Sequence, residues 1–186
     1  MRKLFLIFLI PPLLSGCFPV VATGVGAGTL MAADRRTSGA YIDDEAIELK
    51  ASHRISDEFK DKVHVNVTSY NRSVLLTGEV PSEAVKQRVE QIARSVENVR
   101  SISDELAIME SSSLGSRSDD ILITTKIKGQ FLSSKTVPAN VVKVVTERGV
   151  VYLMGIVSHK EGDAAAQMAS TTNGVQKVVK LFEYTD

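Results

Sequence analysis

The sequence contains no tryptophan, one cysteine and three histidines in 186 residues. One cysteine cannot form a disulfide within the chain, so stability must come from packed cores. Basic and acidic residues are equal in number, 22 of each, and this balance argues against a nucleic-acid-binding protein. With six Phe, four Tyr and no Trp, the chain also lacks the aromatic platform expected of a protein that binds peptidoglycan or other sugars.

The residue patterns of an enzyme or a metal centre are also missing from the sequence. His53, His64 and His159 form no HxxxH motif and have no carboxylate at ligand spacing. The serines include no nucleophile elbow. The acidic pairs Asp43–Asp44 and Asp119–Asp120 are interpreted as helix starts. We therefore predict no catalytic residue, metal site, cofactor or small-molecule substrate, and interpret the chain as a binding module.

The apolar segment at the start of the chain is too short to span a bilayer. Leu4–Leu14 has 11 residues, whereas a transmembrane helix needs about 20. It follows Arg2 and Lys3 and precedes the small residues before Cys17. This is the pattern of a secretory signal peptide with its cleavage site, so residues 1–16 are predicted to be a signal peptide.

The four residues Leu14-Ser15-Gly16-Cys17 resemble the bacterial lipobox, whose cysteine becomes the lipidated first residue of the mature protein. The alternative is an ordinary signal peptide followed by an incidental cysteine. The resemblance implies three acyl chains on Cys17, and several chains anchor firmly because each buried methylene contributes ~0.8 kcal/mol. Phe18 stands where inner-membrane lipoproteins carry Asp, which implies an outer-membrane, periplasm-facing location.

Residues 17–40 are rich in glycine and other small residues and are predicted to be a flexible tether. Gly24, Gly26 and Gly28 alone could suggest a nucleotide-binding loop. However, no strand precedes them and no charged residue follows at the required distance, so the context of that fingerprint is missing. A tether would let the rest of the chain lift off the membrane.

The remainder of the chain is an internal repeat. Val74 corresponds to Val151 and Gly78 to Gly155, an offset of 77 residues. Two copies of about 70 residues indicate the duplication of a whole small domain, because solenoid units are shorter. We therefore predict one domain over residues 41–110 and a second over 119–186, joined by a serine-rich linker at 111–118.

Each copy is expected to contain the same five elements. A capping Asp begins a helix, two strands follow around a turn at Asn71 or Gly149, and a second helix precedes a closing strand. The order αββαβ predicts an α+β fold, with a three-stranded mixed sheet and both helices on one face. The expected helices span residues 44–56, 82–95, 120–133 and 160–171, and the expected closing strands span 99–109 and 175–184.

This order, with a glycine late in the second strand before a hydrophobic residue, resembles the BON domain. The layout of lipobox, tether and two copies resembles the dual BON-domain family of outer-membrane lipoproteins (the DolP-like family). Four stretches carry the local similarity, namely Asn66–Tyr70, Ile123–Lys126, Val144–Glu147 and Leu153–Gly155. The resemblance covers about 140 of the 186 residues.

Gly78 and Gly155 occupy equivalent positions inside predicted strands. A glycine there usually marks a bulge or a close backbone approach, because a side chain would otherwise pack. We expect the second helix of each copy to cross the sheet near these glycines, so a branched residue at Gly155 should unfold its domain.

The opening helices of the two copies differ on the face opposite the core. In the opening helix of the second copy, Ile123, Ile127 and Phe131 share the predicted core face, at 100° per residue. The opposite face and its flanks are apolar with lysines beside them, and we predict that they bind an anionic phospholipid membrane. The predicted lipid-binding residues are Ile121, Leu122, Thr125, Lys126, Lys128, Gly129, Leu132 and Ser133.

The charges of the two copies agree with this assignment. Residues 40–110 contain nine basic and fourteen acidic residues, a net charge of −5. Residues 119–186 contain eight basic and seven acidic residues, a net charge of +1, so only the second copy avoids repulsion by an anionic surface. The alternative is that this helix face packs against the first domain.

The family resemblance implies the same function. Its second BON domain is associated with anionic phospholipids, with the cell-division site and with outer-membrane integrity. One departure is Leu122, where the member compared has Trp, a residue better suited to the headgroup region. A protein-interaction scaffold that supports the outer-membrane protein assembly machinery is the alternative function.

Overall fold

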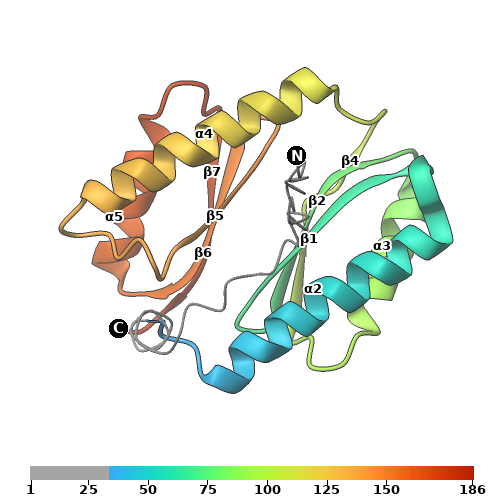
Figure 1. Cartoon of the computed structure of the whole chain (residues 1–186), viewed down its shortest axis with the longest axis horizontal. Coiled ribbons are helices and arrows are strands. Elements are labelled where there is room, and N and C mark those ends of the chain that lie inside the picture. Colours follow the sequence, from blue (N-terminus) through green and yellow to red (C-terminus); the bar gives the residue numbers. More distant parts are fainter. Residues whose placement is uncertain (1–33) are drawn as a thin grey trace, which may run out of the picture.

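The structure, a computed structural model, describes residues 34–186 (Figure 1). The predicted signal peptide, the lipidation site Cys17 and most of the tether lie outside the described residues. No helix within residues 34–186 is long and apolar enough to cross a membrane.

The first domain contains two helices on one face of a mixed sheet. Helix α2 (Ser38–Phe59) and a short 3-10 turn, η1 (Lys60–Lys62), precede the antiparallel strands β1 (His64–Tyr70) and β2 (Ser73–Val80). Helix α3 (Glu83–Arg94) then leads to β3 (Ser101–Asp104) and β4 (Ala107–Ile108), both parallel to β2. The expected closing strand is thus divided, because Leu106 interrupts it and is buried in the core.

The second domain repeats this arrangement. Helix α4 (Leu114–Ser133) precedes the antiparallel strands β5 (Lys143–Glu147) and β6 (Val150–Val157). Helix α5 (His159–Ser170) leads to β7 (Lys177–Tyr184), which is parallel to β6. The predicted α+β fold with two αββαβ domains is therefore confirmed.

Each helix pair covers one face of its sheet because its apolar positions recur at helical spacing. In the second domain Ile127 and Phe131 of α4 pack with Val151 of β6 and Ala165 of α5. In the first domain Ile47 of α2 belongs to the corresponding core. Burying each large aliphatic or aromatic side chain contributes roughly 1.5–3 kcal/mol, which gives each small domain a core of its own.

The prediction that aspartates cap the opening helices was wrong. Helix α2 begins six residues earlier than expected, where Thr37 accepts a hydrogen bond from the Ala40 amide. Helix α4 likewise begins at Leu114, capped by Ser113, so it extends into the segment predicted as a linker. Serine and threonine at these positions satisfy free amides of the first turn, as an aspartate would.

Asp44 and Asp120 instead hold the turn between the first two strands of each domain. Both are buried, at 2% and 7% exposure. Asp44 accepts hydrogen bonds from the amides of Asn71 and Arg72, at 2.8 and 2.7 Å, and Asp120 from those of Arg148 and Gly149, at 2.7 and 2.8 Å. All four turn residues have positive φ, the conformation of a tight hairpin turn.

Gly78 and Gly155 are tightly enclosed, but by the neighbouring strand and not by the helix that we expected. A Cβ on Gly78 would lie 2.0 Å from the carbonyl oxygen of His64, and its φ of +114° is strained for other residues. A Cβ on Gly155 would lie 2.7 Å from the carbonyl oxygen of Val141. In both domains the chain that pairs with the second strand approaches too closely for a side chain.

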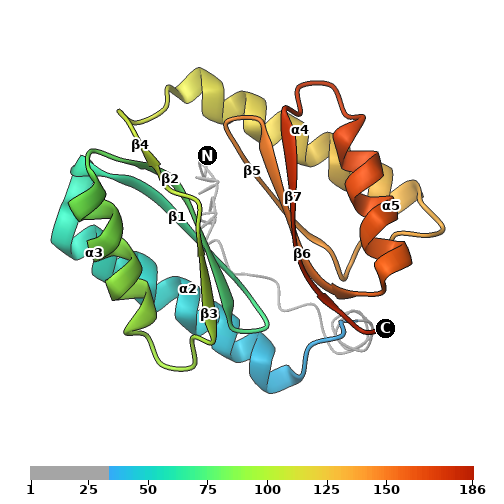
Figure 2. The same ribbon diagram turned by 180° about the vertical axis from the view of Figure 1, so that it is seen from behind.

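The two domains pack through the sheet faces that the helices leave open. Tyr70 and Leu75 of the first domain meet Tyr152 and Met154 of the second in an apolar cluster. The sheets therefore face each other and the helices form the outer layers, with α2 and α3 on one side and α4 and α5 on the other (Figure 2). Each second strand is consequently buried on both faces, which explains its almost continuous apolar sequence.

Candidate functional site

The outward face of α4 is the candidate site. All eight residues predicted to bind lipid are exposed on it. Ile121, Leu122 and Leu132 are 66%, 56% and 78% exposed, which is unusual for large aliphatic side chains on one helix. Leu114 adds a fourth exposed apolar side chain, and sequence reasoning missed it because it lies in the segment taken for a linker.

The helical geometry places these residues opposite the core. Ile123, Ile127 and Phe131 of α4 are buried against the sheet. At 100° per residue, Ile121 and Leu132 project within about 20° of the direction opposite Ile123. The sequence of α4 has apolar residues on two opposite faces. One face packs in the core, so the apolar residues of the other face are left at the surface.

Two hydroxyl groups on this face are already satisfied within the helix. The Thr125 hydroxyl donates to the Ile121 carbonyl at 2.8 Å, and the Ser133 hydroxyl donates to the Gly129 carbonyl at 3.2 Å. Because these hydroxyl groups donate to the preceding turn of the helix, they do not need water as a hydrogen-bond acceptor. Gly129 has open space around it, since a Cβ there would meet no atom within 4 Å.

The lysines of α4 form no ion pair within the described residues, whereas two basic side chains of α2 do. Among residues 34–186, neither Lys126 nor Lys128 has an ion-pair partner, and both are exposed. On α2 Lys50 pairs with Glu97 at 3.4 Å, and His53 with Asp57 at 2.9 Å. Within residues 34–186, α4 therefore presents two lysines without an ion-pair partner beside exposed apolar side chains.

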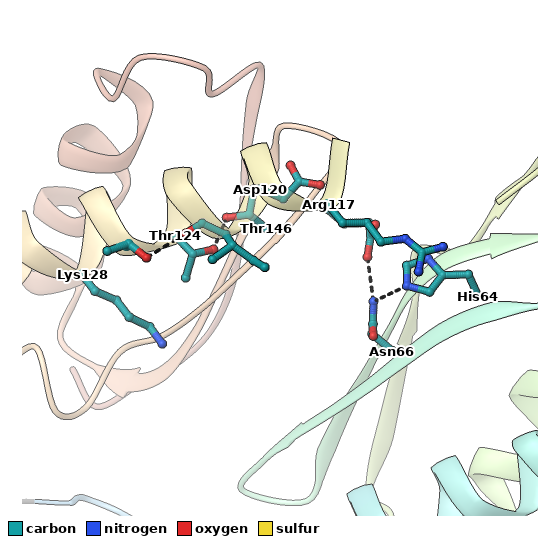
Figure 3. Close-up of a pocket in the computed structure, with 10 residues that line it drawn as sticks. His64, Asn66, Arg117, Asp120, Thr124, Lys128 and Thr146 are labelled. Atoms are coloured by element: carbon teal, nitrogen blue, oxygen red, sulfur yellow. Dashed lines mark hydrogen bonds between the residues drawn. The ribbon is translucent and has the colours of Figure 1, made fainter. Parts of the chain in front are cut away.

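One edge of the α4 face borders a pocket between the domains. Figure 3 shows Thr124 and Lys128 of α4 on one side of this pocket and His64 and Asn66 of β1 on the other, with Arg117 between them. The pocket has a volume of about 460 Å³. Arg117 was missed because it, too, lies in the segment predicted as a linker.

The alternative that this helix face packs on the first domain does not match the observed interface. The interface is formed by the open sheet faces, and Leu122, Lys126 and Leu132 remain exposed. Only Ile121, Thr125 and Lys128 border the interdomain pocket. Within residues 34–186, most of the surface predicted to bind lipid is therefore left uncovered.

The interface itself has a polar margin. Lys143 forms an ion pair with Glu48 at 2.6 Å, and Glu183 forms one with Arg100. Burial raises the pKa of Tyr152 to about 12 and raises the pKa of Glu147, against the opposing effect of a hydrogen bond from the Asn66 amide. The two ion pairs and the Asn66 hydrogen bond join the second domain to the first.

Glu79, beside this margin, is fully buried in the first domain. Burial would raise the pKa of its carboxyl. Hydrogen bonds from the Ser112 amide and the His64 ring outweigh that effect and hold the pKa below its usual value. Glu79 is therefore a buried charge at the edge of the interface.

Comparison with known proteins identifies both copies. Residues 43–110 and 119–186 each match the family model of the BON domain. The chain is 36% identical to a Haemophilus influenzae protein named outer membrane lipoprotein DolP, over 100% of this chain and 97% of the other. It is 37% identical to the 21 kDa hemolysin of Actinobacillus pleuropneumoniae, over 81% of this chain and 79% of that protein.

A further relative is the osmotically-inducible protein Y of Escherichia coli K12, which is 32% identical over 84% of this chain and 80% of its own length. The two family matches coincide with the two αββαβ units seen in the structure. The similarity to the DolP relative also extends through the part of the chain that precedes those units. The chain therefore belongs to the BON-domain family, as a dual BON-domain protein of the DolP-like type.

Proposed function

We propose that this protein is an outer-membrane lipoprotein, anchored through Cys17 and facing the periplasm, that binds anionic phospholipid through α4. The proposal includes a contribution to outer-membrane integrity and recruitment to the division site. The names of the relatives support the anchoring, because one is called an outer membrane lipoprotein. The observation that carries lipid binding is the set of exposed aliphatic side chains on α4 beside two lysines without ion-pair partners among the described residues.

The expected energies suit a tethered protein. Each lysine near an anionic surface contributes ~1 kcal/mol. Partial burial of two or three aliphatic side chains adds a few kcal/mol, at about 25 cal/mol per Å². This is weak on its own, but acyl chains on Cys17 would keep the local concentration of α4 at the membrane high, so a weak contact is sufficient.

Two glutamates introduced on α4 should weaken the contact with the membrane. In a chain of residues 34–186, which contains both cores, Leu122→Glu and Lys126→Glu together should reduce binding to vesicles containing phosphatidylglycerol at least 10-fold. The reason is that the double variant loses apolar area and a favourable charge and gains two repulsive charges. Co-sedimentation with vesicles measures the bound fraction.

The control is Leu49→Glu on α2. Leu49 is 72% exposed on the equivalent helix of the acidic domain, and its substitution should leave vesicle binding unchanged. Equal binding by the unmodified chain and the α4 variant would contradict the proposal. In that case the alternative, a protein scaffold that uses the acidic first domain to support outer-membrane protein assembly, would be tested by crosslinking in cells.

A further inference from the structure

Three metal-ligating side chains from different strands meet at the domain interface. They are His64 on β1, Glu79 on β2 and Glu147 at the end of β5. One ligand atom from each lies within 4.8 Å of the others. The His64 Nδ1 atom is 2.8 Å from Glu79 Oε2, and Asn66, in the first domain, donates its amide to Glu147 in the second at 3.0 Å.

These residues are not part of the repeated core. At the offset of 77 residues, the second copy has Val141 in place of His64 and Ile156 in place of Glu79. The first copy has Tyr70 in place of Glu147. The fold therefore does not need ionisable groups here, and burying them costs free energy unless something compensates.

The compensation within the described residues is incomplete. Glu79 has a fully buried side chain, and its Oε1 atom has no hydrogen-bond donor among residues 34–186. The Arg148 Nη1 atom lies 3.5 Å from this oxygen, and the Arg148 side chain is itself 27% exposed. A buried carboxylate oxygen without a donor indicates a missing partner.

We propose that His64, Glu79 and Glu147 bind one divalent transition-metal ion, with Zn²⁺ as the first candidate. A ring nitrogen and two carboxylate oxygens are ligands that Zn²⁺ accepts at about 2.0–2.2 Å, with water completing the coordination. Ligand atoms around such an ion lie about 3.4 Å apart, so no pair has to close by more than about 1.4 Å. The ion would displace Arg148 from Glu79 and the Asn66 amide from Glu147.

The site is accessible. His64, Asn66 and Glu147 also line the interdomain pocket, where Figure 3 shows His64 and Asn66 beside the open space. Because the ligands come from both domains, the ion stabilises the arrangement in which the two sheets face each other. This inference is independent of lipid binding by α4.

The test uses the full chain, purified in detergent without a histidine tag and treated with a chelator. A calorimetric titration with Zn²⁺ alone should show that one ion binds per chain. At about 100 times the dissociation constant, Zn²⁺ should raise the melting temperature by roughly 5 °C or more, because an ion that binds only the folded state stabilises it.

Two variants and a control decide the assignment. Glu147→Gln, which keeps the shape and an oxygen for the Asn66 amide, and His64→Ala should each weaken Zn²⁺ binding at least 10-fold. His53→Ala removes an exposed histidine that pairs with Asp57 and should change nothing. Absence of saturable binding, or binding that survives Glu147→Gln, would overturn the proposal. If His64→Ala does not fold, as judged by circular dichroism, Glu147→Gln alone decides.

Discussion

Replacing Gly78 by valine is expected to unfold the first domain. A valine would combine a strained φ of +114° with a Cβ only 2.0 Å from the His64 carbonyl oxygen. Strain of this kind costs about 1–3 kcal/mol, and the backbone contact adds to it, so the total should exceed ~3 kcal/mol. In a small domain that corresponds to a fall of more than about 10 °C in melting temperature.

Gly155→Val is the matched variant in the second domain. Its Cβ would lie 2.7 Å from the Val141 carbonyl, but its φ is outside the left-handed region, so it should be destabilising to a smaller extent. Thermal melting followed by circular dichroism compares the two variants with the unmodified chain. An unchanged melting curve for Gly78→Val would show that β1 can move away and that the glycine is not required.

Removing the Asp44 carboxylate should have a similarly large effect. Asp44 accepts hydrogen bonds from the Asn71 and Arg72 amides and from the Ser69 hydroxyl, and it pairs with Arg36 at 2.9 Å. Asp44→Ala would leave several buried donors and one cation without this partner. We expect a loss of ~3–5 kcal/mol in the free energy of unfolding.

The adjacent residue supplies the control. Asp43 forms an ion pair with Arg72 on a more exposed surface, so Asp43→Ala should cost less than about 1 kcal/mol. Urea unfolding of both variants measures the difference through the transition midpoint. Equal midpoints for Asp44→Ala and Asp43→Ala would mean that Asp44 does not hold the hairpin turn.

The repeat and the αββαβ order could be predicted because each element has a local signal. The turns at Asn71 and Gly149 are examples, and the structure places both where the sequence indicates. The predicted helix starts were wrong because, from sequence alone, Asp44 and Asp120 fit two roles equally well: capping a helix and holding a distant turn. A buried aspartate that accepts from a distant turn is indistinguishable from a capping aspartate until the strands are placed.

The domain interface and the His64 cluster could not be predicted from spacing along the chain. Both depend on how two separately folded units pack, and the three ligand residues are far apart in sequence. One signal was available for the interface, since Val74-Leu75-Leu76 is apolar without alternation, as expected of a strand covered on both faces. No comparable signal pairs Glu79 with Glu147.

The absence of tryptophan makes the central claim directly measurable. Leu122→Trp, in the chain of residues 34–186, places a single fluorophore at the centre of the proposed contact, and Leu49→Trp places one on the equivalent helix of the first domain. We predict that phosphatidylglycerol vesicles shift the indole emission of the Leu122→Trp chain to the blue and leave that of the Leu49→Trp chain unchanged. An unshifted emission from the Leu122→Trp chain, or equal shifts in both chains, would contradict membrane binding through α4.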